Sequence, residues 1–259
     1  MPRVSPILRG LVLSAAIVAG YVPAVAGEQQ TEGEKRHSIL KPELQTGTAF
    51  RAKPREVEDP AVVNRMSKAV ANCVNGREAG MVRSFLSVSD PVDTDREAAD
   101  FRWSRFMDVL EGCMKTRWNE MPNDPRRTTL GMAFSDSRLR ALLEEEVYLA
   151  QNDTAPEAVA GQPFQTKRFY VSSDENLARA QGLADFADCL AHRDPKTADA
   201  LLRTEPGSSA ERQAAKALAP SLGACLAKDQ TIEFTASSIR ALAADGLWAW
   251  TTLGPATAE

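Results

Sequence analysis

The strongest constraint on the fold of this chain is an internal repeat in which each copy carries a pair of cysteines. Ala71-Asn72-Cys73-Val74 recurs 116 positions later as Ala187-Asp188-Cys189-Leu190. Further positions match at the same offset: Arg77, Phe85 and Leu86 correspond to Arg193, Leu201 and Leu202. A unit that occurs twice with the same cysteine placement predicts two similar substructures, each with its own small, cross-linked core.

Helical patterns dominate both copies. Apolar side chains recur at steps of three and four, which place them on one face of a helix. These stripes are Ala99, Trp103, Phe106, Leu110 and Cys113 in the first copy, and Ala214, Leu218, Leu222 and Cys225 in the second. We expect Trp103 and Phe106 in the core. Two capping boxes, Thr94-x-x-Glu97 and Ser208-x-x-Glu211, predict where these helices begin, and Pro220 predicts a kink or break in the second.

The last helix of each copy repeats at an offset of 100. Leu139-Arg140-Ala141-Leu142 corresponds to Ile239-Arg240-Ala241-Leu242, and Tyr148 corresponds to Trp248. We expect the two repeated arginines to cap helix ends or to pair with acids, and we expect Tyr148 to pack against its own bundle. Period-two runs of Val, Ile and Thr, which are typical of strands, are scarce.

The sequence therefore predicts an all-α protein of two homologous four-helix repeats, each with one intra-repeat disulfide. The expected segments are a signal peptide at 1–26, a disordered tether at 27–58, repeat 1 at 59–150, a linker at 151–172, repeat 2 at 173–252 and a disordered tail at 253–259.

The first 26 residues predict an export signal. Arg3 and Arg9 give a positive start, a short apolar run follows, and Ala24-Val25-Ala26 is a cleavage site of small residues. The apolar run is short for a hydrocarbon core of ~30 Å, so we expect cleavage after residue 26 rather than an uncleaved anchor. Residues 27–58 are polar and charged and lack apolar periodicity, which is typical of a disordered tether.

The four cysteines supply one pair to each copy, and each pair joins the first helix of the copy to the third. Because an exported protein meets an oxidising compartment, we expect the disulfides Cys73–Cys113 and Cys189–Cys225. The equivalence of the two pairs selects this connectivity over the other pairings. Four buried free thiols are the alternative. A zinc site is disfavoured because the chain has no C-x-x-C motif and no nearby pair of histidines.

Residues that could carry catalysis are few. His37 lies in the tether, and His192 is expected on the surface, in a turn. The chain has no G-x-S-x-G, H-E-x-x-H, Walker or G-x-G-x-x-G motif, so we assign no catalytic, cofactor-binding or metal-ligating residue. The densest acidic run, Glu144-Glu145-Glu146, points in three directions on a helix, and we expect it to form a solvated face.

One segment departs from the repeat. Copy one carries about twelve more residues between Cys113 and Phe134 than copy two carries between Cys225 and Phe234. The extra segment and its approach include Trp118, Arg126 and Arg127. A basic loop with a tryptophan on an acidic chain is a candidate contact site for a partner protein, an anionic glycan or a lipid headgroup. A surface insertion without a binding role is the alternative.

The order of these features resembles that of uncharacterised exported helical proteins of Gram-negative alphaproteobacteria, in which a Cys-paired unit occurs twice. The shared features are the export signal, the A-x-C-[VL] motif, a D-P or E-P-G turn, a capped helix that ends in Cys, and an L-R-A-L or I-R-A-L segment that runs to Tyr or Trp. The resemblance covers about two thirds of the chain and is clearest in 198–226. Its motifs are structural, so it implies a fold but no catalytic residue.

Charge and chemistry together favour a non-catalytic role. The net charge of −4 at pH 7 argues against a general nucleic-acid binder. We expect a periplasmic or secreted helical module that interacts with an envelope protein or acts as a scaffold, with no transmembrane segment after signal cleavage and no cofactor. Two alternatives stay open. One binds an apolar small molecule or an unfolded chain in a dry pocket between the repeats, lined by Met and aromatic residues. The other is a carboxylate-dependent hydrolase of envelope polymers, with two acids roughly 5–10 Å apart in a cleft.

Overall fold

The structure is a computed structural model that describes residues 59–120, 134–157, 164–226 and 233–255. The expected signal peptide at 1–26 and the tether at 27–58 lie outside these ranges. So do Arg126 and Arg127, the two arginines of the predicted contact loop.

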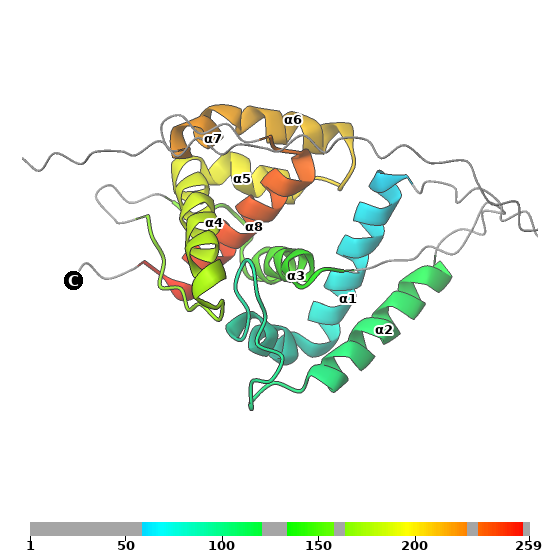
Figure 1. Ribbon diagram of the computed structural model, residues 1–259. Coiled ribbons are helices and arrows are strands. Elements are labelled where there is room, and N and C mark those ends of the chain that lie inside the picture. Colours follow the sequence, from blue (N-terminus) through cyan, green and yellow to red (C-terminus); the bar gives the residue numbers. More distant parts are fainter. Residues whose placement is uncertain (1–58, 121–133, 158–163, 227–232, 256–259) are drawn as a thin grey trace, which may run out of the picture. The chain divides into compact units, whose positions relative to one another are not determined.

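The described residues form eight helices and no strand, which confirms the all-α class (Figure 1). The first three helices are α1 (Pro60–Ser87), α2 (Trp103–Glu120) and α3 (Asp136–Gln151). The other five are α4 (Asp174–Arg193), α5 (Pro195–Leu202), α6 (Ser209–Ala217), α7 (Ala219–Cys225) and α8 (Ala236–Leu253). Within the described ranges, no helix is both long enough and apolar enough to cross a membrane.

The first two helices expected in each copy meet at a bend of nearly the same backbone conformation. Glu78 interrupts α1 with φ −141° and ψ 55°, and Asp194, 116 positions later, separates α4 from α5 with φ −144° and ψ 63°. In copy two the Asp194 side chain accepts a hydrogen bond from the Thr197 N–H, and Pro195 occupies the start of α5, where its missing N–H costs nothing. The two bends therefore lie at positions that correspond at the sequence offset of 116.

The third helix expected in copy two begins at the predicted capping box and breaks at the predicted proline. Ser208 is the N-cap of α6, and its hydroxyl accepts a hydrogen bond from the Glu211 N–H at 3.0 Å. The Glu211 carboxylate accepts from the Gly207 N–H at 2.6 Å, so the serine and the glutamate each satisfy a backbone donor at the helix start. The predicted break at Pro220 is confirmed, because α6 ends and α7 begins just before it.

The capping box predicted at Thr94 is wrong, because α2 begins only at Trp103. Thr94 instead forms an isolated antiparallel bridge with Ser89. The Asp90 carboxylate accepts hydrogen bonds from the N–H groups of Val92 and Asp93. Because these backbone N–H groups bond to the Asp90 side chain, the segment forms a turn rather than a helix, although its sequence matches a helix start.

The core is continuous across both copies, so the prediction of a separate small core in each copy is wrong, and α3 lies at its centre. It packs against α1 on one side and against α8 on the other, while α4 and α5 pack on α8 (Figure 1). In copy one the rings of Phe85 and Phe106 stack with centroids 4.9 Å apart. Phe106 is fully buried and Trp103 packs partly against the same cluster, as the helical stripe predicts.

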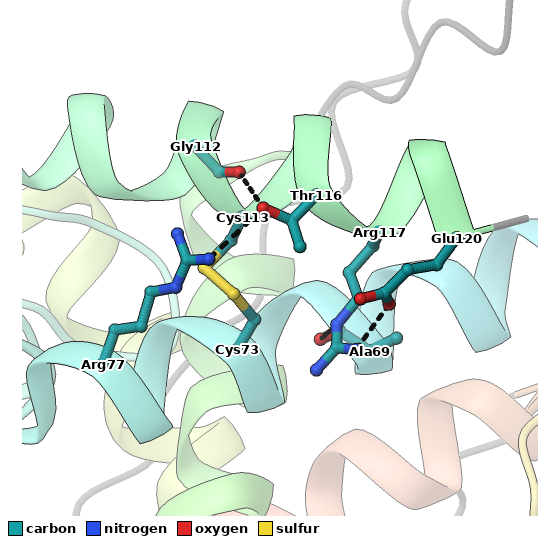
Figure 2. The surroundings of a disulfide bond; sticks show 8 residues. All are labelled: Ala69, Cys73, Arg77, Gly112, Cys113, Thr116, Arg117 and Glu120. Atoms are coloured by element: carbon teal, nitrogen blue, oxygen red, sulfur yellow. Dashed lines mark hydrogen bonds and ion pairs between the residues drawn. A yellow bond between two sulfur atoms is a disulfide. The ribbon is translucent and has the colours of Figure 1, made fainter.

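Both predicted disulfides are present, and the described residues contain no free cysteine. Cys73–Cys113 joins α1 to α2 with a Cα–Cα distance of 5.7 Å, and Cys189–Cys225 joins α4 to α7 at 5.9 Å. Figure 2 shows the contacts on either side of the first bond. Arg77 donates to the Thr116 hydroxyl, and Arg117 donates from α2 to the Ala69 carbonyl on α1.

Candidate functional site

The candidate site is a groove between α3 and α8, the helices that carry the repeated L-R-A-L and I-R-A-L segments. The groove has a volume of about 490 Å³. Apolar side chains line it from four parts of the fold: Ala141, Leu142, Leu183, Phe234, Ala241 and Leu242. Buried charged side chains also line it, and they connect the two copies.

The two repeated arginines occupy equivalent positions under this groove. Arg140 donates from Nη1 to the Leu86 carbonyl at 2.9 Å, and Arg240 donates from Nη2 to the Leu202 carbonyl at 2.7 Å. Leu86 and Leu202 are 116 positions apart and lie in the last turns of α1 and α5. Carbonyls in a last helical turn lack intrahelical partners, so each arginine caps the helix of its own copy. The prediction that these arginines cap helix ends or pair with acids is confirmed.

Arg240 also joins copy two to copy one. Its Nε and Nη2 atoms donate to the two carboxylate oxygens of Glu145 at 2.8 and 2.7 Å, which is the bidentate geometry that favours arginine. Nη1 lies 3.2 Å from Glu211 on α6. Lys68 of α1 pairs with the same Glu145 carboxylate. Glu145 therefore ties α1, α3 and α8 together at one buried point.

The prediction that Glu144-Glu145-Glu146 forms a solvated face is wrong. Their exposed fractions are 1%, 2% and 4%. The reason is the central place of α3: its successive side chains do point in different directions, but α1 and α8 cover those directions. Glu146 turns toward α1, where it accepts from Asn72 Nδ2 at 2.7 Å and pairs with Lys68 at 2.9 Å.

Glu144 differs from its two neighbours because it faces another acid. Arg140 lies 2.8 Å from its carboxylate. Burial nevertheless raises the pKa of Glu144 well above its ordinary value, and a hydrogen bond with Asp245 raises that pKa further. A carboxylic acid that donates to a neighbouring carboxylate avoids the repulsion of two buried negative charges. The raised pKa of Glu144 therefore favours its neutral form beside Asp245.

Acids outnumber bases in the buried network as a whole. Its bases are Lys68, Arg140, Arg168 and Arg240, and its acids are Glu144, Glu145, Glu146, Asp188, Glu211 and Asp245. The raised pKa of Glu144 favours the neutral form of this acid, which reduces the excess of negative charge.

Arg168 is a buried member of the network that the sequence does not reveal, because it stands in the segment expected to be a plain linker. It donates to Asp245 at 2.7 Å and pairs with Asp188. These two carboxylates outweigh burial and raise the pKa of Arg168 above its ordinary value. One signal was available: Asp188 stands in the repeat where copy one has Asn72, so copy two carries an extra buried charge that needs a partner.

The same linker is fastened to copy one through Asp90. The N–H groups of Val171 and Ser172 donate to the Asp90 carboxylate at 2.9 and 2.7 Å. Burial alone would raise the pKa of Asp90, but hydrogen bonds from backbone N–H groups, including those of Asp93 and Val92, hold it below its ordinary value. The linker therefore contacts both copies through fixed polar groups.

Tyr148 extends beyond the copy in which it was expected to pack. Its side chain is fully buried, and its hydroxyl donates to Asp199 on α5 at 2.8 Å. The equivalent Trp248 of α8 in turn lies under the Arg140 guanidinium of copy one, 5.1 Å from the ring centroid. Equivalent aromatic residues thus reach across the interface in both directions.

The remaining sequence candidates lie elsewhere. Trp118 is on α2, where it packs partly against the core and does not line the groove. His192 lies in the last turn of α4 rather than in a surface turn. It is half-buried, with its ring 5.4 Å from that of Trp250.

Across the part of the chain that the structure describes, no group of three or more His, Cys, Asp or Glu side chains is placed to hold a metal ion. Comparisons with protein-family models, with curated proteins and with solved structures find no significant match to this chain.

Proposed function

We propose that this chain is an exported binding module of the cell envelope, and that a partner protein docks in the groove between α3 and α8. The observation that carries this proposal is that the buried acids are already engaged by cations or hydrogen-bond donors of the protein itself. All eight buried acids of the described residues have a cation, a hydrogen-bond donor or both: Asp90, Glu144, Glu145, Glu146, Asp188, Asp199, Glu211 and Asp245.

This use of the acids favours binding over hydrolysis. A general acid or base has to exchange its proton with the substrate, so it must be reachable and poised for transfer. Glu145 is held in a bidentate pair with Arg240 and also meets Lys68. Removing such a carboxylate from its partners would leave buried charges uncompensated. The network is better suited to hold the groove walls in place than to transfer protons.

The walls themselves suit an apolar segment of a protein. Leu142 and Leu242 occupy equivalent positions on α3 and α8, and each has a small neighbour, Ala141 or Ala241. A groove of this kind accepts the apolar face of a helix or extended segment. Phe234 is the one aromatic side chain among the lining residues, and methionine is not among them, so the lining favours a protein segment over an apolar small molecule.

Export is supported by the two disulfides, because such bonds persist in oxidising compartments and are rare in reducing ones. The periplasmic or secreted location and the common origin of the two copies are parts of this proposal. The matching bends at Glu78 and Asp194 and the matching arginine caps support that common origin.

Site-specific photo-crosslinking in the native host tests the proposal. p-Benzoylphenylalanine is placed at Leu142 or at Leu242, and for comparison at Met107, which is 41% exposed on α2 and does not line the groove. We expect both groove positions to give one protein adduct of the same mass, and Met107 to give none.

A second variant checks that the adduct depends on the groove. Leu242→Arg should abolish the adduct formed from position 142 while both disulfides stay intact by non-reducing peptide mapping. The proposal is wrong if the groove positions give no protein adduct, if they give only lipid or glycan adducts, or if Met107 gives the same protein.

A further inference from the structure

A second cavity, which shares Pro91 and Arg140 with the groove, lies where α1, the linker and the C-terminal half of α8 meet. Its volume is about 290 Å³. Four cationic side chains line it, namely Arg83, Arg140, Lys167 and Arg168, and three aromatic ones, namely Phe169, Tyr170 and Trp248. No carboxylate is among its lining residues, although the chain as a whole has a net charge of −4.

The four cations fall into two kinds. Arg140 and Arg168 already contact buried acidic side chains of the network, Arg140 through Glu144 and Arg168 through Asp188 and Asp245. Arg83 and Lys167 are exposed, and within the described ranges neither forms an ion pair or a side-chain hydrogen bond. The cavity thus has two cations whose charge nothing in the described protein compensates, and an anion lying between them would be attracted by both.

The repeat shows that the fold does not require a cation at Arg83. Its counterpart 116 positions later is Asp199, which accepts hydrogen bonds from Tyr148 and Arg203. The same place in the framework therefore carries opposite charges in the two copies. In copy two the charge of Asp199 has partners within the protein. In copy one the charge of Arg83 has none among the described residues, which suggests that it binds a ligand.

The aromatic side chains supply the rest of a binding site. Phe169 lines the cavity with 72% of its surface exposed, so its ring can pack against a ligand. Burial raises the pKa of Tyr170 to about 12, so its hydroxyl keeps its proton and can donate. That hydroxyl has no hydrogen-bond partner in the described part of the chain. Trp248 forms an inner apolar wall, with 5% of its surface exposed.

From these observations we propose that this cavity binds a small amphiphilic anion, with an oxyanion head such as a phosphate monoester or a carboxylate joined to an apolar body. Arg83 and Lys167 neutralise the head, and the Tyr170 hydroxyl donates a hydrogen bond to it. The apolar body lies against Trp248 and Phe169. The volume is near the lower end for small-molecule sites, roughly 300–1,000 Å³, which favours a compact ligand over a polymer.

Isothermal titration calorimetry on the purified exported chain tests this proposal with octyl phosphate as the probe, below its micellar concentration. Octyl glucoside carries the same apolar chain without the charge, and inorganic phosphate carries the charge without the chain. We expect octyl phosphate to bind at least tenfold more tightly than either, because only it uses both parts of the site. Equal affinity for octyl glucoside and octyl phosphate would overturn the proposal.

Variants assign the binding to this cavity. The double substitution Arg83→Gln and Lys167→Gln should weaken octyl phosphate binding at least tenfold, and Tyr170→Phe should weaken it about threefold. The matched control is Arg179→Gln with Lys196→Gln, which removes two exposed cations of α4 and α5 that do not line the cavity. The control should change the affinity by less than twofold. An equal loss in both double variants would mean non-specific attraction and would contradict the site.

The source of the anion is decided by flotation with vesicles of phosphatidylglycerol and phosphatidylcholine. If the chain floats with phosphatidylglycerol vesicles and the Arg83→Gln, Lys167→Gln variant does not, the ligand is a lipid headgroup. If octyl phosphate binds but the chain stays in the soluble fraction, the ligand is a soluble organic anion. The site is absent if neither probe binds in a way that these two cations control.

Discussion

Helices α3 and α8 occupy equivalent places in the repeat but meet their neighbours differently. On α3 the run Glu144-Glu145-Glu146 pairs with cations: Glu144 with Arg140 of the same helix, and Glu145 and Glu146 with Arg240 of α8 and Lys68 of α1. On α8 the corresponding run is Ala244-Asp245-Gly246, and a Cβ atom at Gly246 would lie 2.2 Å from the Ala187 carbonyl oxygen of α4. At the last position of the run, α3 therefore packs through the charged side chain of Glu146, whereas α8 packs through close backbone approach at Gly246. The same framework accommodates both.

The largest expected effect is a difference in unfolding free energy between substitutions of the two equivalent arginines, Arg240 and Arg140. Arg240→Met removes the cation shared by Glu145 and Glu211, so it leaves two buried carboxylates without that partner. Breaking a buried ion pair in this way costs about 3–5 kcal/mol. Arg140→Met should cost less, because its acid partner Glu144 already favours the protonated form. Denaturant unfolding at neutral pH measures both costs, and an equal cost for the two arginines would contradict this account of the network.

The second effect tests the close approach of α8 to α4. Gly246→Ala forces the helices apart, because the added methyl group would collide with backbone atoms that cannot rotate away. We expect a loss of about 2–3 kcal/mol in unfolding free energy, as for other overpacked sites. Gly182→Ala on α4 is the matched control: its Cβ meets nothing within 4 Å, so it should stabilise the chain by about 0.5–1 kcal/mol. Similar effects of both substitutions would mean that α4 and α8 are not tightly packed.

The third effect is a dependence of stability on pH. Burial raises the pKa of Glu144 in the folded chain, so above the ordinary pKa of glutamate the folded state holds a proton that the unfolded state has lost. Stability should therefore fall as the pH rises through the interval between these two pKa values, with a slope of up to about 1.4 kcal/mol per pH unit. Glu144→Gln should flatten the dependence, since glutamine keeps a neutral donor.

The control for the pH experiment is Glu97→Gln, at an exposed position with no ion pair among the described residues. Unfolding titrations from about pH 5 to pH 8 compare the three chains. A wild-type slope that survives Glu144→Gln would assign the proton to another group.

Local patterns predicted much of this fold, and long-range packing decided the rest. The cap at Ser208 and the break at Pro220 depend on neighbouring residues, so the sequence is sufficient to predict them. The burial of Glu144-Glu145-Glu146 depends on which helices flank α3, which no local pattern reports. The role of Arg168 was missed because it lies outside any periodic segment. At Thr94 a local helix signal lost to a competing turn.

The smallest expected effect concerns the shared bend. Asp194→Ala removes the side chain that accepts from the Thr197 N–H at the start of α5, and loss of an N-cap costs about 1 kcal/mol. Glu78→Ala, at the equivalent bend, removes only an exposed pair with Arg105, which is worth little. Thermal unfolding of both variants checks the difference. A larger cost at Glu78 would mean that the bend in copy one is held by contacts other than those described.

The disulfide connectivity has a consequence for how the chain matures. Each disulfide joins two cysteines that are consecutive along the chain, Cys73 with Cys113 and Cys189 with Cys225. If the chain is threaded through a membrane N-terminus first, as its proposed export implies, Cys113 emerges while Cys73 is the sole earlier thiol, and the first bond can close before Cys189 appears. Oxidation in order of emergence then yields the native pairing directly. Maturation would need an oxidant but no isomerase, unlike that of proteins whose disulfides interlace.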